Sequence, residues 1–140
     1  GNVLTRYLAQ VPNNPYKAAA VICAPLDLAS CSARINKGLS KLYQKYLLEM
    51  LKDSALEKVT NKLIDHIPTK LLEKITTIRD FDNAVTAPLN GFRSAEHYYQ
   101  QASGKQVMHD IKPPCLFIHS TDDPFLCHQQ ALPQKALPKH

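Results

Sequence analysis

Residues 115–119 read Cys115-Leu116-Phe117-Ile118-His119, and Ser120-Thr121-Asp122-Asp123-Pro124 follows them directly. The apolar run has no polar alternation, which is typical of a strand buried on both faces of a parallel sheet. A second run of this kind is Lys17–Ala24, which ends at Pro25. We therefore expect two central strands of an α/β fold with a parallel sheet.

The segment between these two strands is predicted to be helical. It spans about ninety residues, whereas a simple crossover needs only about a dozen or more. Its clearest feature is a stripe of apolar residues at helical spacing, which we expect to face the core rather than a membrane or a cofactor. Similar spacing predicts one helix that ends before Pro68 and a short helix that runs up to Ile78. Two further helices are predicted over Ser94–Ala102, with Ser94 as the N-cap, and over Asn2–Gln10, ahead of the first strand. The stripe consists of Leu39, Leu42, Tyr43, Tyr46, Leu47, Met50 and Leu51.

Composition and charge exclude several classes of protein. Hydrophobic residues make up 44% of the chain, and no apolar run approaches the ~18 residues that a membrane span needs. Much of the net charge of +5 lies between Arg34 and Lys74, where acidic residues are interleaved with basic ones as on a solvated helix face. We therefore expect neither a membrane span nor nucleic-acid binding. No secretory signal is visible in the first residues, and the four cysteines are widely spaced, so we expect reduced thiols and a cytoplasmic protein.

Two acidic positions follow the strands, where parallel α/β sheets gather their catalytic groups. Asp27 follows the first strand, and we expect it to cap a helix rather than to act as a functional acid. Asp122 and Asp123 follow the second strand and either orient a histidine or simply form a turn. No histidine has a setting that identifies it as a base, and we expect His119 to be a satisfied core residue. We expect no metal and no cofactor, since metal-ligand spacings and glycine-rich phosphate loops are missing from the sequence.

These residues resemble those of the YheT-like α/β-hydrolases, an esterase branch of the α/β-hydrolase superfamily. The resemblance covers about residues 1–128 and corresponds to the C-terminal portion of that family. Its most specific part is the block Asp80–Phe92. The matching segments are Gly1–Leu4, which looks like the end of a Gly-x-Ser-x-Gly-Gly-Asn nucleophile elbow, then Pro25–Leu28, Cys31-Ser32, Tyr43–Leu48, Asp80–Phe92, Ala95–Ser103 and His119–Phe125.

The resemblance implies a serine carboxylesterase or lipase-like acyl-ester hydrolase with a Ser, Asp, His triad in that chain order. It assigns the triad acid to Asp123, with Asp122 as the alternative. The sequence contains no Gly-x-Ser-x-Gly and no Gly-Gly-His, so the nucleophile and the histidine have no counterpart here. Residues 1–28 and 103–140 are then a partial α/β-hydrolase core, and residues 29–102 are a helical cap or lid.

On this interpretation the parent protein is an enzyme that acts on a small-molecule or lipid-like ester, and these 140 residues alone are inactive. The alternative is a non-catalytic helical binding module that works on a remnant hydrolase scaffold through its basic helices.

Overall fold

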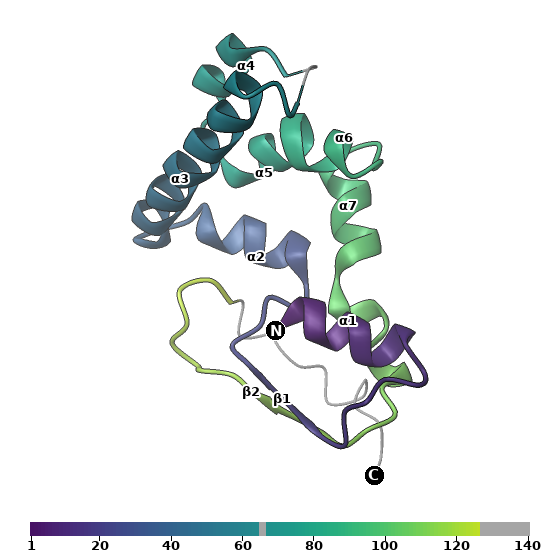
Figure 1. Cartoon of the computed structure of the whole chain (residues 1–140). Coiled ribbons are helices and arrows are strands. Elements are labelled where there is room, and N and C mark those ends of the chain that lie inside the picture. Colours follow the sequence, from purple (N-terminus) through teal and green to yellow (C-terminus); the bar gives the residue numbers. More distant parts are fainter. Residues whose placement is uncertain (65–66, 127–140) are drawn as a thin grey trace. The chain divides into compact units, whose positions relative to one another are not determined.

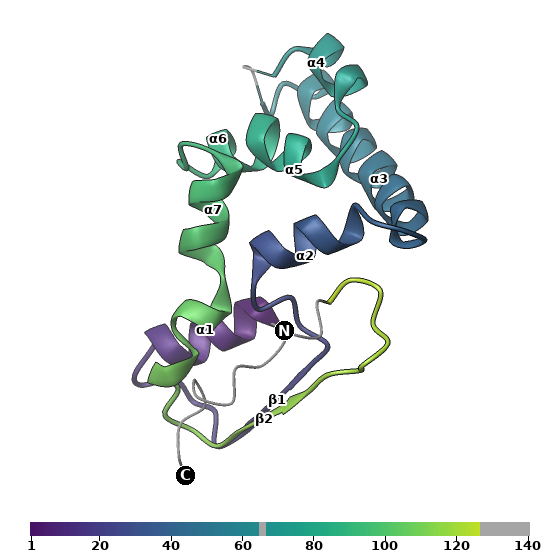
Figure 2. The same cartoon turned by 180° about the vertical axis from the view of Figure 1, so that it is seen from behind.

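The computed structural model describes residues 1–64 and 67–126 (Figures 1 and 2). The chain forms two compact units. One contains Gly1–Arg34 and the segment that begins at Tyr99, and the other is Ile35–Tyr98. His66, His128, His140 and the tail from Gln129 onward lie outside the described residues.

The first unit holds a parallel pair of strands, β1 (Ala19–Ile22) and β2 (Cys115–Ile118), which run side by side in Figure 1. Ala19 pairs with Cys115 and Ile22 with Ile118, so the strands are in full register. This confirms the predicted α/β class with parallel strands. The pairing needs a long crossover, because parallel strands cannot be joined by a tight turn.

Within residues 1–64 and 67–126, only one face of this strand pair is covered. Val21 is buried, and it packs in a cluster with Leu8 of α1 (Asn2–Gln10) and Met108 of the 3₁₀ helix η3 (Met108–Asp110). The expectation of strands buried on both faces is wrong for the described residues, since Ile22 is 63% and Leu116 is 60% exposed. The physical reason is that α1 and η3 pack against the Val21 side, and the other side receives no comparable cover from the described chain.

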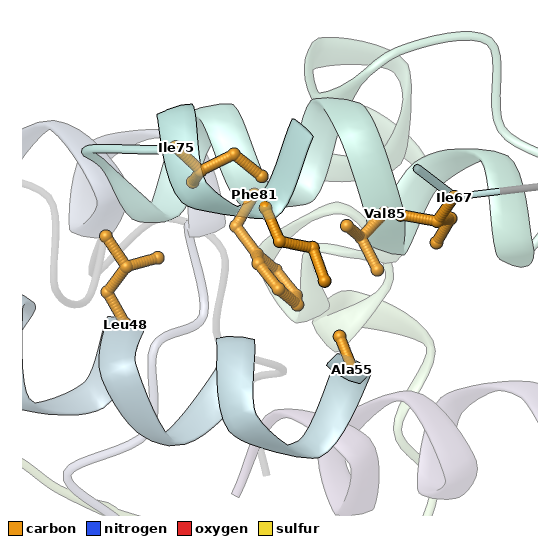
Figure 3. Packing of buried hydrophobic residues seen from close by; sticks show 7 residues of the cluster. Leu48, Ala55, Ile67, Ile75, Phe81 and Val85 are labelled. Atoms are coloured by element: carbon orange, nitrogen blue, oxygen red, sulfur yellow. The ribbon is translucent and has the colours of Figure 1, made fainter. Parts of the chain in front are cut away.

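The second unit is entirely helical over its described residues. Its core joins α3 to the segment around α5, and Figure 3 shows Leu48 and Ala55 of α3 facing Phe81 and Val85. The chain passes between the two units within α2 and within α7. The helices are α2 (Leu28–Ile35), α3 (Ser40–Thr60), α4 (Thr69–Lys74), α5 (Ile78–Phe81), the π-helix η1 (Asp82–Thr86), α6 (Ala87–Leu89) and α7 (Ala95–Ala102).

Helix α3 buries a different face from the one that its apolar spacing predicts. Its buried residues are Ser40, Gln44, Leu48 and Ala55. Five residues of the predicted core stripe are instead more than half exposed, and we call them the α3 stripe: Leu39, Leu42, Tyr43, Tyr46 and Met50.

Gln44 gives a physical reason for this orientation of α3. Its Nε2 donates to Asn36 Oδ1 at 3.1 Å, and its Oε1 accepts the Ile78 N–H at 3.2 Å. A buried amide with both ends hydrogen-bonded is tolerated in a core. Turning α3 to bury the stripe would break both bonds and expose Leu48.

The most specific block of the sequence, Asp80–Phe92, contains the π-helix η1. The Ala87 N–H donates to the Asp82 carbonyl, which is the wider hydrogen bond of a π-helix. Pro88 has no N–H to continue an α-helical ladder at this point. Asn83 Oδ1 accepts the Ala95 N–H at 3.1 Å and so satisfies the start of α7. Within the described residues this block therefore organises the helical unit.

Helix α7 begins at Ala95, where the sequence placed its start. The Ser94 hydroxyl accepts the His97 N–H at 3.2 Å, which confirms the predicted N-cap. Of the helices that the structure describes, none combines the length and the apolar character that crossing a membrane requires.

Candidate active site

The carboxyl ends of β1 and β2 lie together because the strands are parallel and in register. Pairing continues one residue past β1, where the Cys23 N–H donates to the Ile118 carbonyl at 2.8 Å. Cys23 has a φ of 43°, a left-handed conformation that is uncommon for a residue other than glycine. The chain thus turns sharply at the end of β1, and the acidic residues that follow both strands belong to this edge of the sheet.

Asp123 is the more buried of the two candidate acids. Its Oδ1 accepts the Phe125 N–H at 2.8 Å, so the carboxylate is fixed within a tight turn. Asp123 is half-buried, whereas Asp122 is exposed and accepts a hydrogen bond from the Ser120 hydroxyl. Which of these acids acts in catalysis stays a prediction.

His119 is the first residue after β2, and its imidazole is not satisfied by the described residues. Both ring nitrogens are buried, and neither has a hydrogen-bond partner within residues 1–64 and 67–126. The expectation of a satisfied core histidine is therefore wrong for this part of the chain. Burial lowers the pKa of His119, and the negative charge of Asp123 opposes this shift. The two side chains are thus electrostatically coupled at the end of β2.

Asp27 caps α2, as its sequence setting predicts. Its Oδ1 accepts the Ser30 N–H at 3.1 Å, and its Oδ2 accepts a hydrogen bond from Lys105 Nζ at 3.1 Å. Burial alone would raise the pKa of Asp27, but the bonds from Ser30 and Lys105 outweigh it and lower that pKa. A carboxylate committed to a cap and an ion pair is a structural group.

Two further side chains join the start of α2, the end of α7 and the N-terminus of α1 within the first unit. The Ser103 hydroxyl accepts the Leu28 N–H at 3.1 Å. The Asn2 amide donates to the Ala102 carbonyl at 2.9 Å and accepts the Gly104 N–H at 2.7 Å. Sequence reasoning missed Asn2, Ser103 and Lys105, because their partners are at least 75 residues away along the chain.

Gly1 is required by close packing at the same edge of the sheet. A Cβ atom on Gly1 would lie 2.4 Å from the Cβ of Ala24, far inside contact distance. The N-terminus of α1 is thereby brought against the segment that follows β1. Within the described residues, no group of three His, Cys, Asp or Glu side chains could hold a metal ion.

The helical unit contains a separate hollow of about 230 Å³. Apolar side chains of α3, α5, η1 and α6 make up most of its lining, with a few polar groups among them. The volume is below the ~300 Å³ at which ligand pockets usually begin. The lining residues are Leu51, Ser54, Ala55, Lys58, Ile64, Phe81, Val85, Thr86, Leu89 and Asn90.

Comparison with known proteins gives relatives along nearly the whole chain. One relative is YheT of Escherichia coli (strain K12), whose name describes it provisionally as an esterase. It is 38% identical over 99% of this chain and 41% of its own length. The phospholipase ABHD3 of Bos taurus is 30% identical over 89% of this chain and 31% of its own length. A monoacylglycerol lipase of Saccharomyces cerevisiae is 30% identical over 89% of this chain and 29% of its own length.

The chain thus spans less than half of the length of each of these relatives. No family model and no solved structure matches it. Two of the relatives are named for ester cleavage in lipids, and the fold described above has the parallel strands of their class. This chain belongs to the YheT-like branch of the α/β-hydrolases.

Proposed function

We propose that this chain is part of a serine carboxylesterase or lipase-like acyl-ester hydrolase and supplies the acid of its catalytic triad, Asp123. The observation that carries the proposal is the setting of Asp123. It follows β2 at the carboxyl edge of the parallel pair, it is half-buried, and the Phe125 N–H fixes one of its carboxylate oxygens. Catalytic groups of α/β sheets belong at this edge.

In such a triad the serine attacks the ester carbonyl, and the histidine accepts the serine proton and then returns it to the leaving group. The role of Asp123 is to accept the N–H of that imidazole, to hold the ring in the correct tautomer and to stabilise the imidazolium. A carboxylate held by a backbone N–H keeps its orientation during these transfers. Since the sequence contains neither Gly-x-Ser-x-Gly nor Gly-Gly-His, we propose that the serine and the histidine lie outside these 140 residues. The chain alone is then inactive.

Residues 29–102 are proposed to act as a cap that provides contacts for the acyl chain. Two observations support this. Ile35–Tyr98 forms a compact unit of its own, inserted between the two strands. That unit also holds the mostly apolar hollow of about 230 Å³, which would have to widen to take more than a short hydrocarbon chain.

The role of Asp123 is tested in the full-length protein with p-nitrophenyl esters. We expect Asp123→Asn to lower kcat/KM by about 10³-fold to 10⁴-fold, because an amide in place of the carboxylate favours the wrong imidazole tautomer. Asp122→Asn is the matched control, and we expect it to retain activity close to wild type.

A large loss in Asp122→Asn alone would transfer the role to Asp122. A protein that hydrolyses no ester in wild-type form would favour the alternative, a helical binding module on a hydrolase scaffold. Circular dichroism of both variants checks that any loss of rate is not a loss of folding.

The cap is tested by Leu89→Asp, because Leu89 lines the hollow and is 39% exposed, so the fold should tolerate the change. We expect kcat/KM to fall more for long acyl chains than for acetate esters. Leu63→Asp is the control, since Leu63 is 74% exposed and does not line the hollow. An unchanged chain-length profile in Leu89→Asp would contradict the cap.

A further inference from the structure

The α3 stripe is an exposed apolar surface that the proposed hydrolase function leaves unused. Its five side chains are between 52% and 83% exposed, and they follow helical spacing over residues 39–50. Single exposed apolar residues are normal on protein surfaces. Five of them along one side of a helix form a continuous patch, and such patches mark interaction sites.

The patch is not the consequence of a poorly packed helix. The opposite face of α3 is buried through Gln44, Leu48 and Ala55, and Figure 3 shows Leu48 and Ala55 packed against the neighbouring segment. Helix α3 therefore has one apolar face for the core of its unit and a second apolar face that points to solvent. A helix of this kind can use its outer face without losing its own packing.

Along the sequence, the charged residues that lead into α3 and fill its first two turns are all basic. Residues 28–48 contain Arg34, Lys37, Lys41 and Lys45 and no Asp or Glu. The three lysines form no ion pair with any residue of the described ranges 1–64 and 67–126. Acidic residues begin at Glu49, so the positive region accompanies the α3 stripe from Leu39 to Tyr46.

We propose that the α3 stripe docks the protein onto a lipid surface that carries anionic headgroups. In this arrangement Leu39, Leu42 and Met50 insert at the boundary between headgroups and acyl chains. Tyr43 and Tyr46 lie at headgroup level, where amphipathic rings are favoured. Lys41 and Lys45 extend along the apolar surface and place their ammonium groups near the phosphates.

The chemistry of the patch favours lipid over a protein partner. Aliphatic and tyrosine side chains on one face of a helix, with Lys41 and Lys45 beside them and the first acid only at Glu49, are typical of helices that lie in the membrane interface. The inference stands independently of ester hydrolysis, because it rests on exposure and charge alone. Attachment is peripheral, since the other face of α3 belongs to the core of the protein.

The test is co-sedimentation of the full-length protein with two kinds of vesicle, phosphatidylcholine alone and phosphatidylcholine with phosphatidylserine. We expect binding to the anionic vesicles to be at least about tenfold tighter and to weaken as salt is raised. The double variant Leu42→Gln/Tyr46→Gln should weaken binding about tenfold or more. Both side chains are at least two-thirds exposed, so the fold should not change.

Leu63→Gln is the matched control, because Leu63 is equally exposed but lies beyond α3, and its binding should equal that of wild type. Lys41→Gln/Lys45→Gln should lose the preference for anionic vesicles. Equal binding by wild type and the stripe variant, or no binding at all, would overturn the proposal.

Two other occupants of the stripe are separate outcomes that also overturn it. Light scattering would reveal a second copy if wild type is a dimer and the stripe variant is a monomer. Maleimide labelling of the full-length Leu42→Cys variant tests whether another part of the protein covers the stripe. A thiol that reacts only after unfolding would show that it does.

Discussion

The orientation of α3 can be tested with two substitutions that exchange polarity between its faces. Gln44 is 5% exposed, and its amide makes two hydrogen bonds, one to Asn36 and one from the Ile78 N–H. Gln44→Leu keeps the size of the side chain and removes both bonds. Each is worth about 0.5–1.5 kcal/mol, so we expect the free energy of unfolding to fall by about 1–3 kcal/mol. The N–H of Ile78 is left without its partner at the start of α5.

Leu42→Gln makes the reverse exchange on the α3 stripe. Leu42 is 70% exposed, so we expect a change of at most about 0.5 kcal/mol. If the apolar spacing of the sequence instead decided the buried face, Leu42→Gln would cost about 2 kcal/mol or more, and Gln44→Leu would be neutral or stabilising.

The assay is urea unfolding of the full-length protein followed by far-UV circular dichroism, with hydrogen exchange of the α3 amides as a local measurement. A stable Gln44→Leu variant together with a strongly destabilised Leu42→Gln variant would refute the orientation of α3. It would also remove the basis for lipid docking, since the stripe would then be core.

Four further outcomes concern the first unit. Folding lowers the pKa of Asp27, so its contribution to stability is present above its ordinary pKa of 3.8 and is lost as the pH falls through the lower folded value. Asp27→Asn should therefore be less stable than wild type at neutral pH. In acid-unfolding curves the stabilities of the two proteins should converge. Burial lowers the pKa of His119 and Asp123 raises it, so Asp123→Asn should lower that pKa further in an NMR titration, and an unchanged value would separate the two groups. Because folding lowers the pKa of His119, the folded protein holds this imidazole in its neutral form. The stability of the folded state should therefore be unaffected by His119 above its ordinary pKa of 6.5 and should fall as the pH drops below that value. Gly104→Ala should destabilise the protein by about 1–3 kcal/mol in thermal unfolding, because the new Cβ would lie 2.7 Å from Asn2 Oδ1.

The local elements of this protein follow from short patterns in its sequence. Asn2–Gln10 is helical and ends before two prolines, as its spacing and turn residues predict. The two apolar runs form the parallel strands, although each strand is shorter than its prediction. Asp27 and Ser94 cap their helices because an N-cap depends only on a side chain and the N–H groups two or three residues later.

The resemblance to a family was also carried by short motifs, and the comparisons agree with it. The roles of Asp122 and Asp123 were not decided by these motifs, because adjacent carboxylates differ only in their surroundings. Their different burial and partners became visible only in the folded chain. Their catalytic roles remain a prediction for the experiments above.

Tertiary structure alone decided which apolar surface is covered. Periodicity reports how apolar residues are spaced along a helix, but burial depends on where a neighbouring segment lies. Helix α3 carries apolar residues on two faces, and the contacts of Gln44 with Asn36 and Ile78 settle which face turns inward. The tertiary structure also decides two hydrogen-bonding outcomes. It brings Asn2 to the Gly104 N–H, which is distant in sequence, and it buries the ring nitrogens of His119 without a partner among the described residues.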